Sequence, residues 1–281
     1  MSTIVYGGQG NVQLKHLHQM IKTKKGQELL LQLETCDQTA YQLFQDILAK
    51  KVDLQDLYAA MLTTFLYNAW ISPEEPIEVG TRFSAHSAGI FNVLLASRSA
   101  SFQDILAFIK KRAQLVKSLS CQEELYLVMT EDMELFDQKV LKVYPDKFQL
   151  AILTDMRSGV LAMRQEDLSI LQNAAKEAGL LLKVKPLGVK APYHTSFLSD
   201  SQESYRKMVQ ELHIQQNQAY EYIFHCDDLE EEILYQWHHL FNWQKIKEGI
   251  LDKDTDVLDL SPNKFISKQL MKMRRGRRDR E

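Results

Sequence analysis

Ser87 is the first candidate for chemistry, because it lies in the segment Ala85-His86-Ser87-Ala88-Gly89. A β-prone run at 77–83 precedes this segment, and an apolar pattern with helical spacing follows at 90–96. A serine on a sharp turn between a strand and a helix exposes its hydroxyl, and the next backbone N–H can stabilise an oxyanion. The segment predicts a nucleophile of the Gly-x-Ser-x-Gly type. However, alanine replaces the first glycine, and a Ser-x-Gly pair is common by chance.

A serine nucleophile needs a base, and His194 is the best placed of the eight histidines. It follows Ala191-Pro192-Tyr193, where Pro192 restricts the backbone after the last strand expected in that region. Loops at strand ends carry many functional residues. A surface histidine without a catalytic role is the alternative. The pair His238-His239 lies in an apparent helix and is interpreted as a structural face.

Arg112 is the third candidate, because it lies on the apolar side of a predicted helix. Ser101 with Asp104 forms an N-cap signature, and the helix continues with an apolar stripe that includes Ile109 and Val116. A guanidinium on an inward face needs an anion. It would pair with a buried protein carboxylate, or it would bind a ligand carboxylate through two parallel hydrogen bonds. The residues alone leave both interpretations open.

The elements expected around these residues predict an α/β fold. A short β-prone run, Ile4-Val5-Tyr6, leads into a turn that holds Gly7, Gly8 and Gly10, which is typical of the first strand of an α/β sheet. Apolar residues then recur at helical spacing up to about Trp70, and 72–76 ends the helices.

The segment from about 123 to 187 has its own pattern of elements. We expect strands at 124–129, 148–153, 159–163 and 180–184, and helices at 133–143 and 166–178. This order is βαββαβ, the ferredoxin-like unit. We therefore predict an α/β-hydrolase-like core formed by 1–121 and 188–263, an inserted ferredoxin-like subdomain at 122–187, and a basic C-terminal tail at 264–281.

The composition restricts the class of protein. The chain has 281 residues, of which 45% are hydrophobic and 25% charged, so disordered and fibrous classes are excluded. Apolar stretches fall short of the roughly 20 residues that a membrane span needs, and no signal pattern begins the chain. We expect a cytoplasmic protein. The cysteines, Cys36, Cys121 and Cys226, are few and far apart, which predicts free thiols rather than a disulfide framework or a zinc cluster.

The tail from Lys264 onward carries a net charge of +6, whereas the rest of the chain carries −9. A solvated terminus, a nucleic-acid arm and a docking element for an acidic protein are the alternatives. No aromatic residues interleave with the arginines, and we expect no nucleic-acid partner.

Together these segments resemble the malonyl-CoA:acyl-carrier-protein transacylase family, the acyltransferases of fatty acid and polyketide biosynthesis. Five motifs occur in the family's order over nearly the whole chain: the glycine loop 7–13, the elbow 85–89, the arginine helix 111–116, the histidine loop 191–194 and the terminal segment 259–264. Five motifs in order are specific where each alone is not.

The resemblance implies a role for each candidate. Ser87 would be the nucleophile and His194 its general base, with the oxyanion held by the backbone N–H groups of Gln9 and Ala88. Arg112 would bind the malonyl carboxylate, and Tyr193 would disfavour α-branched acyl groups. A backbone carbonyl in the stretch 241–243, that of Asn242, would orient the histidine. The active site would lie in the cleft between the core and the inserted subdomain.

The sequence also departs from the family pattern. Besides Ala85, the glutamate that usually follows the elbow glycine is Ile90, the terminal motif has Ser261 and Asn263 in place of glycines, and Thr154–Arg157 replaces an asparagine-containing loop. These changes put recognition of the carrier and of CoA in doubt more than the chemistry. They favour a specialised transferase, acting in trans on a polyketide or hybrid peptide assembly line.

The function predicted from the resemblance is transfer of a malonyl group from malonyl-CoA to the thiol of an acyl carrier protein. We expect a monomer that needs no metal or redox cofactor and binds no membrane. Two alternatives stay open: an editing hydrolase that releases acyl groups from carriers, and a non-catalytic subunit whose basic tail docks on a carrier or synthase. Retention of Arg112 argues against the first, and the presence of both Ser87 and His194 argues against the second.

Overall fold

The computed structural model describes residues 2–119, 121–253 and 256–278 and divides the chain into two compact units. The first unit comprises 1–113, 208–230 and 246–281, and the second comprises 114–207 and 231–245. The second unit extends on both sides of the predicted 122–187, and it also includes 231–245, which contributes β8 (Phe241–Asn242) to the second sheet.

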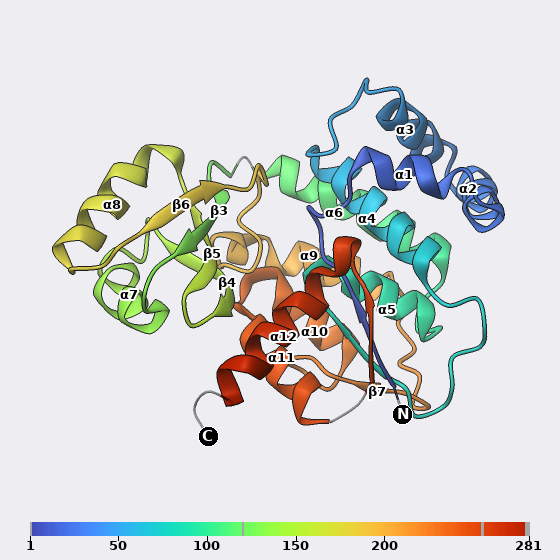
Figure 1. The fold of residues 1–281 in the computed structure, drawn as a ribbon. Coiled ribbons are helices and arrows are strands. Elements are labelled where there is room, and N and C mark those ends of the chain that lie inside the picture. Colours follow the sequence, from blue (N-terminus) through green and yellow to red (C-terminus); the bar gives the residue numbers. More distant parts are fainter. Residues whose placement is uncertain (1, 120, 254–255, 279–281) are drawn as a thin grey trace. The chain divides into compact units, whose positions relative to one another are not determined.

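The first unit is built on a four-stranded sheet in the order β7-β2-β1-β9, with all neighbours parallel (Figure 1). Its strands are β1 (Ser2–Tyr6), β2 (Arg82–Ala85), β7 (Glu221–Tyr222) and β9 (Asp256–Leu260). The two central strands, β1 and β2, end at Tyr6 and Ala85, directly before the glycine loop and the serine turn. The parallel sheet thus places these two loops at one edge, as α/β folds place their functional loops.

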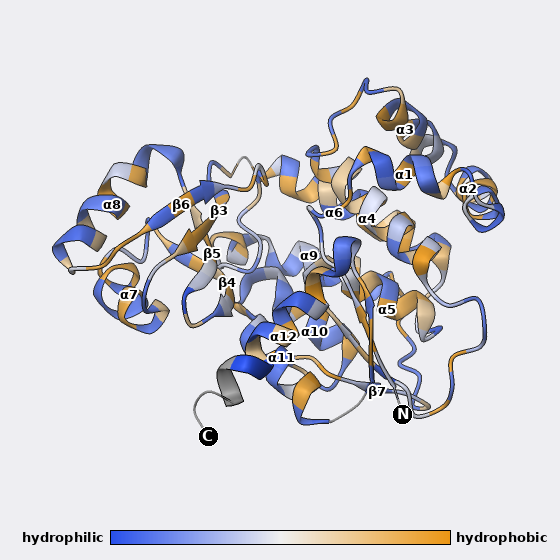
Figure 2. Ribbon diagram, in the orientation of Figure 1, coloured by the Kyte–Doolittle hydropathy of each residue, from blue (hydrophilic) through white to orange (hydrophobic). Residues whose placement is uncertain are grey.

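The first unit also contains helices. They are α1 (Leu14–Met20), α2 (Lys24–Cys36), α3 (Gln38–Leu48), α4 (Leu57–Ile71), α5 (Ile90–Ala96), and the greater part of α6 (Phe102–Ser118), with the end of α9 (Gln202–Gln210), most of α11 (Trp243–Asp252) and α12 (Phe265–Arg278). Of these, α5 and α12 contact the sheet, and α1, α2 and α3 contact α4. Helix α4 is apolar on all sides, and Figure 2 shows its hydrophobic turns in orange. Its residues from Ala59 to Asn68 are buried, so α4 is the central helix of this unit.

The second unit contains a five-stranded sheet in the order β6-β3-β5-β4-β8. The strands are β3 (Glu124–Met129), β4 (Gln149–Asp155), β5 (Ser158–Met163), β6 (Lys183–Pro186) and β8. Helices α7 (Met133–Lys139) and α8 (Leu168–Glu177) lie on the same side of the sheet (Figure 1), and Phe136 and Leu171 share one apolar core with the strands. The predicted βαββαβ unit is confirmed, and β8 is added to it in parallel with β4.

The remaining elements of the second unit are short helical turns, η2 (Leu141–Val143), η3 (Gln165–Asp167) and η4 (Ser196–Ser201), together with the start of α9 and most of α10 (Leu229–His238). Among the described residues, no helix has both the length and the apolar character that a membrane span requires. None of the three cysteines forms a disulfide.

Two strand predictions differ from the structure. The strand expected at 77–83 begins only at Arg82, because Gly80 adopts a left-handed backbone (φ 82°) that turns the chain just before it. The strand expected at 180–184 lies at Lys183–Pro186, since Gly179 also turns the chain with a positive φ of 74°. In the tail, α12 extends from Phe265 to Arg278, and residues 279–281 of the predicted tail lie outside the described residues.

Candidate active site

Ser87 lies on a sharp turn between β2 and α5, as predicted. The turn is a 3-10 helix, η1 (Ser87–Gly89), and Ser87 adopts a left-handed backbone with φ of 48°. This conformation is unfavourable for a residue with a side chain and is concentrated at functional sites. The N–H of His86 donates to the carbonyl of Tyr6 over 2.9 Å, so the turn is tied to β1 as well as to β2.

Glycine allows the serine turn and the glycine loop to approach each other. A Cβ on Gly89 would lie 2.8 Å from the carbonyl oxygens of both Tyr6 and Gly7, and a Cβ on Gly8 would lie 2.5 Å from the carbonyl oxygen of His86. Both distances are shorter than any real Cβ contact, so side chains are excluded at these positions. The loop that leads to Gln9 therefore packs backbone to backbone against the turn that holds Ser87 and Ala88.

Ala85, which replaces the first glycine of the elbow motif, fits the structure. It is fully buried at the end of β2 and pairs in register with Tyr6 of β1. The close contacts that exclude a side chain occur at Gly8 and Gly89 rather than at Ala85. The alanine is therefore compatible with the elbow.

His86, directly before the serine, is held neutral by its surroundings. Burial lowers its pKa to about 4, and the positive charge of Lys247 acts in the same direction. The ring of Phe265 meets the His86 ring edge-on, with 6.0 Å between the ring centroids. His86 therefore packs beneath the turn as an uncharged group at neutral pH.

Arg112 is buried in α6, as its place on the apolar stripe predicted, and only 5% of it is exposed. The predicted N-cap is present, since the N–H of Asp104 donates to the Ser101 hydroxyl over 3.1 Å. The Arg112 Nη1 lies 3.4 Å from the Met61 sulfur, and its guanidinium carbon lies 5.9 Å from the centre of the Phe91 ring. Phe91 belongs to α5, the helix that Ser87 precedes, so Arg112 and Ser87 occur in the same unit.

His194 and Tyr193 belong to the second unit, and both are buried. His194 has a left-handed backbone with φ of 64°, and its N–H donates to the carbonyl of Trp237 over 3.2 Å. The rings of Tyr193 and Trp237 are tilted, with centroids 6.0 Å apart. His194 is 2% exposed, so the alternative of a surface histidine does not hold.

Asn242 directly follows Phe241, whose ring contacts that of His194. The ring of Phe241 lies 5.3 Å from that of His194, and the Asn242 side chain accepts the N–H of Lys245 over 3.0 Å at the start of α11. The structure thus gives Asn242 a capping contact. Its predicted role near the histidine stays a prediction.

Trp237 is a residue of this site that the sequence analysis missed. Its indole N–H donates to the Ser201 hydroxyl over 3.0 Å, and its ring stacks on Tyr205 with 4.0 Å between centroids. In the neighbouring pair His238-His239, His239 stacks on Tyr235, and burial lowers the pKa of His238. The sequence offered one signal for Trp237, a tryptophan directly before the histidine pair, because large aromatic side chains often lie in the protein core.

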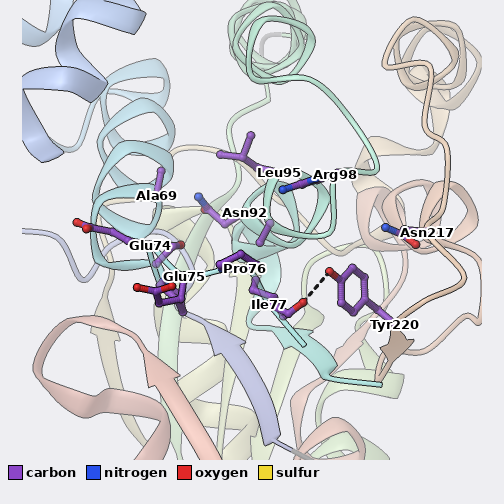
Figure 3. A pocket seen from close by; sticks show the side chains of 13 residues that line it. Ala69, Glu74, Glu75, Pro76, Ile77, Asn92, Leu95, Arg98, Asn217 and Tyr220 are labelled. Atoms are coloured by element: carbon purple, nitrogen blue, oxygen red, sulfur yellow. Dashed lines mark hydrogen bonds between the residues drawn. The ribbon is translucent and has the colours of Figure 1, made fainter. Parts of the chain in front are cut away.

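The structure also has a cavity of about 440 Å³ in the first unit, lined in part by Asn92, Leu95 and Ala96 of α5. Figure 3 shows Asn92 and Leu95 on one wall, with Arg98, Asn217 and Tyr220 around it, and the Tyr220 hydroxyl donates to the Ile77 carbonyl over 3.2 Å. None of the predicted site residues lines it. Elsewhere in the described part of the chain, no three His, Cys, Asp or Glu side chains are grouped to hold a metal ion.

The sequence matches no protein-family model and no curated protein. Solved structures are similar, however. The malonyl CoA-acyl carrier protein transacylase of Burkholderia pseudomallei superposes with a TM-score of 0.81 at 14% identity, over 98% of this chain and 98% of that one. FabD of Acinetobacter baumannii gives 0.79 at 14% identity, over 96% and 90%. The chain has the malonyl-CoA:acyl-carrier-protein transacylase fold.

Other structures with the transacylase fold come from polyketide biosynthesis. A malonyl-transacylase crystallised with its type II polyketide acyl-carrier protein gives a TM-score of 0.79 at 14% identity, over 96% of this chain and 91% of that one. Nearly complete coverage in both directions means that the parallel sheet and the ferredoxin-like unit both belong to the transacylase fold. The expected fold class is confirmed.

Proposed function

We propose that the protein is an acyltransferase that moves a malonyl group from malonyl-CoA to the phosphopantetheine thiol of an acyl carrier protein. The observation that supports this proposal most directly is the serine turn. Ser87 has a left-handed backbone and follows a central parallel strand, and two glycines let a second loop pack directly against the turn. Such a turn presents a serine hydroxyl next to backbone N–H groups, which is the geometry that acyl transfer needs.

The first step is acylation of the enzyme. The Ser87 oxygen attacks the thioester carbonyl of malonyl-CoA while His194 accepts the serine proton. The N–H groups of Gln9 and Ala88 stabilise the oxyanion of the tetrahedral intermediate. The intermediate then expels the CoA thiolate, which takes the proton from His194, and a malonyl-serine ester remains. This step requires His194 within hydrogen-bond reach of Ser87 in the working enzyme.

The second step is the same chemistry in reverse, with a different thiol. His194 removes the proton of the carrier's phosphopantetheine thiol, and the sulfur attacks the serine ester. Collapse of the second tetrahedral intermediate returns the proton to Ser87 and leaves malonyl on the carrier. Both steps use only groups of this chain and the two substrates, so we propose no metal or redox cofactor.

Specificity for the acyl group would come from two buried residues, Arg112 and Tyr193. Arg112 would pair its guanidinium with the free carboxylate of the malonyl group, which accounts for a buried cation whose neighbours include Met61 and Phe91. The exposed cations of α12, Lys268, Arg274 and Arg275 among them, would attract an acidic carrier. A specialised enzyme of polyketide or hybrid peptide biosynthesis, acting as a soluble cytoplasmic monomer, remains our proposal for its context.

The test is intact-protein mass spectrometry after exposure to malonyl-CoA, with Ser87→Ala as the matched variant. We expect the unmodified protein to gain one malonyl group and Ser87→Ala to gain none while keeping its melting temperature. A carrier protein added afterwards should then acquire the malonyl mass.

Two results would contradict the proposal. A folded, monodisperse protein that gains no malonyl mass would instead favour a non-catalytic docking subunit. An adduct that decays to free malonate at the same rate with and without carrier would favour an editing hydrolase.

A further inference from the structure

Two asparagines are buried in the helices that flank the serine turn. Asn68 lies near the end of α4 and is 0% exposed, and Asn92 lies in α5 and is 1% exposed. The surrounding positions of both helices are apolar, and a buried amide costs free energy unless it is hydrogen-bonded. An aliphatic residue of similar size would fill either position, so the amides require an explanation.

The amide of Asn68 reaches out of its helix to the glycine loop. Its Nδ2 donates to the carbonyl oxygen of Gly7 over 2.8 Å, across 61 residues of sequence. The same Nδ2 donates to the Oδ1 of Asn92 over 3.1 Å, and the Asn92 Nδ2 donates to the Phe65 carbonyl over 2.9 Å. Asn92 therefore fixes the orientation of the Asn68 amide, with its donor side toward the loop.

The two polar atoms of the Asn68 side chain differ: the Nδ2 is hydrogen-bonded, whereas, within the described part of the chain, the Oδ1 is not. Its Oδ1 is buried and accepts no hydrogen bond from any described residue. An unsatisfied buried acceptor destabilises the folded state, so a residue present for stability alone would be apolar or fully satisfied. Asparagine at this position supplies the Nδ2 donor, but no residue that the structure describes pairs with the Oδ1 acceptor. The hydrogen bond to Gly7 therefore accounts for the presence of an amide better than stability does.

Two hydrogen bonds and a close backbone contact restrain Gly7. Its N–H donates to the Leu260 carbonyl of β9 over 3.2 Å, and its carbonyl oxygen, which accepts from Asn68, lies 2.8 Å from where a Cβ on Gly89 would be. A further chain of bonds secures α4 to β1, because the Ser72 hydroxyl donates to the Asn68 carbonyl over 2.7 Å and lies 3.0 Å from the Tyr6 hydroxyl. The direction of the Gly7–Gly8 peptide is thereby fixed.

We infer that Asn68, oriented by Asn92, is a positioning residue that sets the Gly7–Gln9 loop for oxyanion stabilisation. Glycine residues leave this loop without side-chain restraint, and the Asn68 amide supplies the restraint through the backbone. The inference rests on the proposed function, in which the Gln9 N–H faces the developing oxyanion. Two peptide bonds connect the Gly7 carbonyl to that N–H, so a shift of the first peptide is passed to the donor.

Asn68→Leu tests the inference, with Thr64→Val as the matched control. Thr64 is a buried polar residue one turn earlier in α4, and its hydroxyl donates only within the helix, to the Ala60 carbonyl over 2.7 Å. Amide hydrogen exchange, followed by mass spectrometry on peptides covering 7–13, measures the restraint of the loop without any substrate. We expect faster exchange in this segment for Asn68→Leu and unchanged exchange for Thr64→Val.

Steady-state malonyl transfer supplies the second readout. We expect Asn68→Leu to lower kcat about 10- to 100-fold, as small displacements of catalytic groups do, with KM unchanged because ground-state binding is untouched. Asn92→Ala should give a smaller change in the same direction, and it keeps the test valid if Asn68→Leu does not fold.

The outcomes separate this inference from the proposed function. Unchanged exchange at 7–13 in both Asn68→Leu and Asn92→Ala would overturn the inference, as would an equal loss of kcat in Thr64→Val. If the unmodified protein transfers no malonyl group but Asn68→Leu still accelerates exchange only at 7–13, the positioning of the loop stands and the proposed function fails.

Discussion

The backbone N–H of His194 donates to the carbonyl oxygen of Trp237 over 3.2 Å, which fixes a histidine whose φ of 64° is left-handed. A non-glycine residue holds this conformation only where its surroundings impose it. Trp237 can impose it because its own position is fixed from two directions, by the stacked ring of Tyr205 and by the hydroxyl of Ser201. The orientation of the proposed base is therefore set by a buried residue 43 positions later in the chain.

Ser201→Ala should loosen this arrangement. The variant removes the acceptor of a buried indole N–H, which costs about 1–3 kcal/mol of unfolding free energy. Because Trp237 then shifts, His194 shifts with it, and we expect malonyl loading of Ser87 to fall about 10-fold or more. Denaturant unfolding and the rate of adduct formation measure the two effects.

Ser97→Ala is the control for Ser201→Ala. Ser97 is also buried, and its hydroxyl donates to the Val93 carbonyl over 2.7 Å, but it belongs to the first unit, whereas His194, Ser201 and Trp237 belong to the second. Both variants should lose stability, and only Ser201→Ala should lose malonyl loading. Equal loading rates in the two variants would show that the Ser201–Trp237 contact is structural only.

His86 should make the protein less stable in mild acid. Its pKa in the folded state is lowered to about 4, whereas the unfolded chain has the ordinary histidine value of about 6.5. As the pH falls below about 6.5, the unfolded state binds a proton that the folded state does not, so the free energy of unfolding decreases until about pH 4. One such group changes it by at most about 1.4 kcal/mol per pH unit.

The comparison with His86→Gln isolates this effect. His16 and His238 also have lowered pKa values, so all three histidines act in the same direction in the unmodified protein. We expect urea unfolding at pH 7 and pH 5 to show a smaller loss for His86→Gln than for the unmodified protein. The same loss in both proteins would mean that the pKa of His86 is the same in the folded and unfolded states.

Local patterns were sufficient to predict much of the fold. The strand before the glycine loop, the N-cap at Ser101 and the order of the ferredoxin-like unit depend on residues close in sequence, and all three are confirmed. Arg112 was found in the same way, because a cation on an apolar helical stripe is visible at a spacing of three and four residues.

The contacts that position the candidate site could not be predicted from such patterns. Asn68 meets Gly7 across 61 residues, and Trp237 meets Ser201 across 36, so neither pair produces a periodic signal. The strand predicted at 77–83 begins later in the structure for a related reason: Gly80 lies in a β-prone run of sequence, but its φ of 82° places it in a turn. Glycine adopts positive and negative φ values about equally readily, so its backbone conformation depends on the residues that pack around it. Secondary-structure propensities along the sequence do not contain that information.

Tyr193 should disfavour acyl groups with an α-methyl branch. The residue is 4% exposed and its ring packs near that of Trp237, so its position before His194 is restrained and cannot yield easily to an added methyl group. One methyl group against a rigid wall is worth about 1–3 kcal/mol, or roughly 10- to 200-fold in selectivity. Competition between malonyl-CoA and methylmalonyl-CoA, read by intact mass, measures it. Equal labelling by the two would remove Tyr193 from the account of specificity.

Arg112→Ala separates recognition of the carboxylate from acyl transfer itself. Removing one partner of a buried, hydrogen-bonded charge pair costs about 2–5 kcal/mol, so malonyl loading should fall roughly 30-fold to several thousand-fold. Acetyl loading should not fall with it, because an uncharged acetyl group gains nothing from the guanidinium. Rates with malonyl-CoA and acetyl-CoA, measured beside the melting temperature, give the comparison.

The structural interpretation of Arg112 predicts a different pattern. If the guanidinium serves mainly to pair with a protein carboxylate, its loss leaves a buried charge unpaired and lowers the melting temperature, and both loading rates decline together. Arg112→Lys sharpens the distinction, because lysine keeps the charge but cannot form two parallel hydrogen bonds to one carboxylate. Malonyl loading in Arg112→Lys should therefore stay well below that of the unmodified protein while the acetyl rate and the melting temperature are retained. Parallel loss of both rates in the two variants would assign Arg112 to the core of the first unit rather than to the substrate.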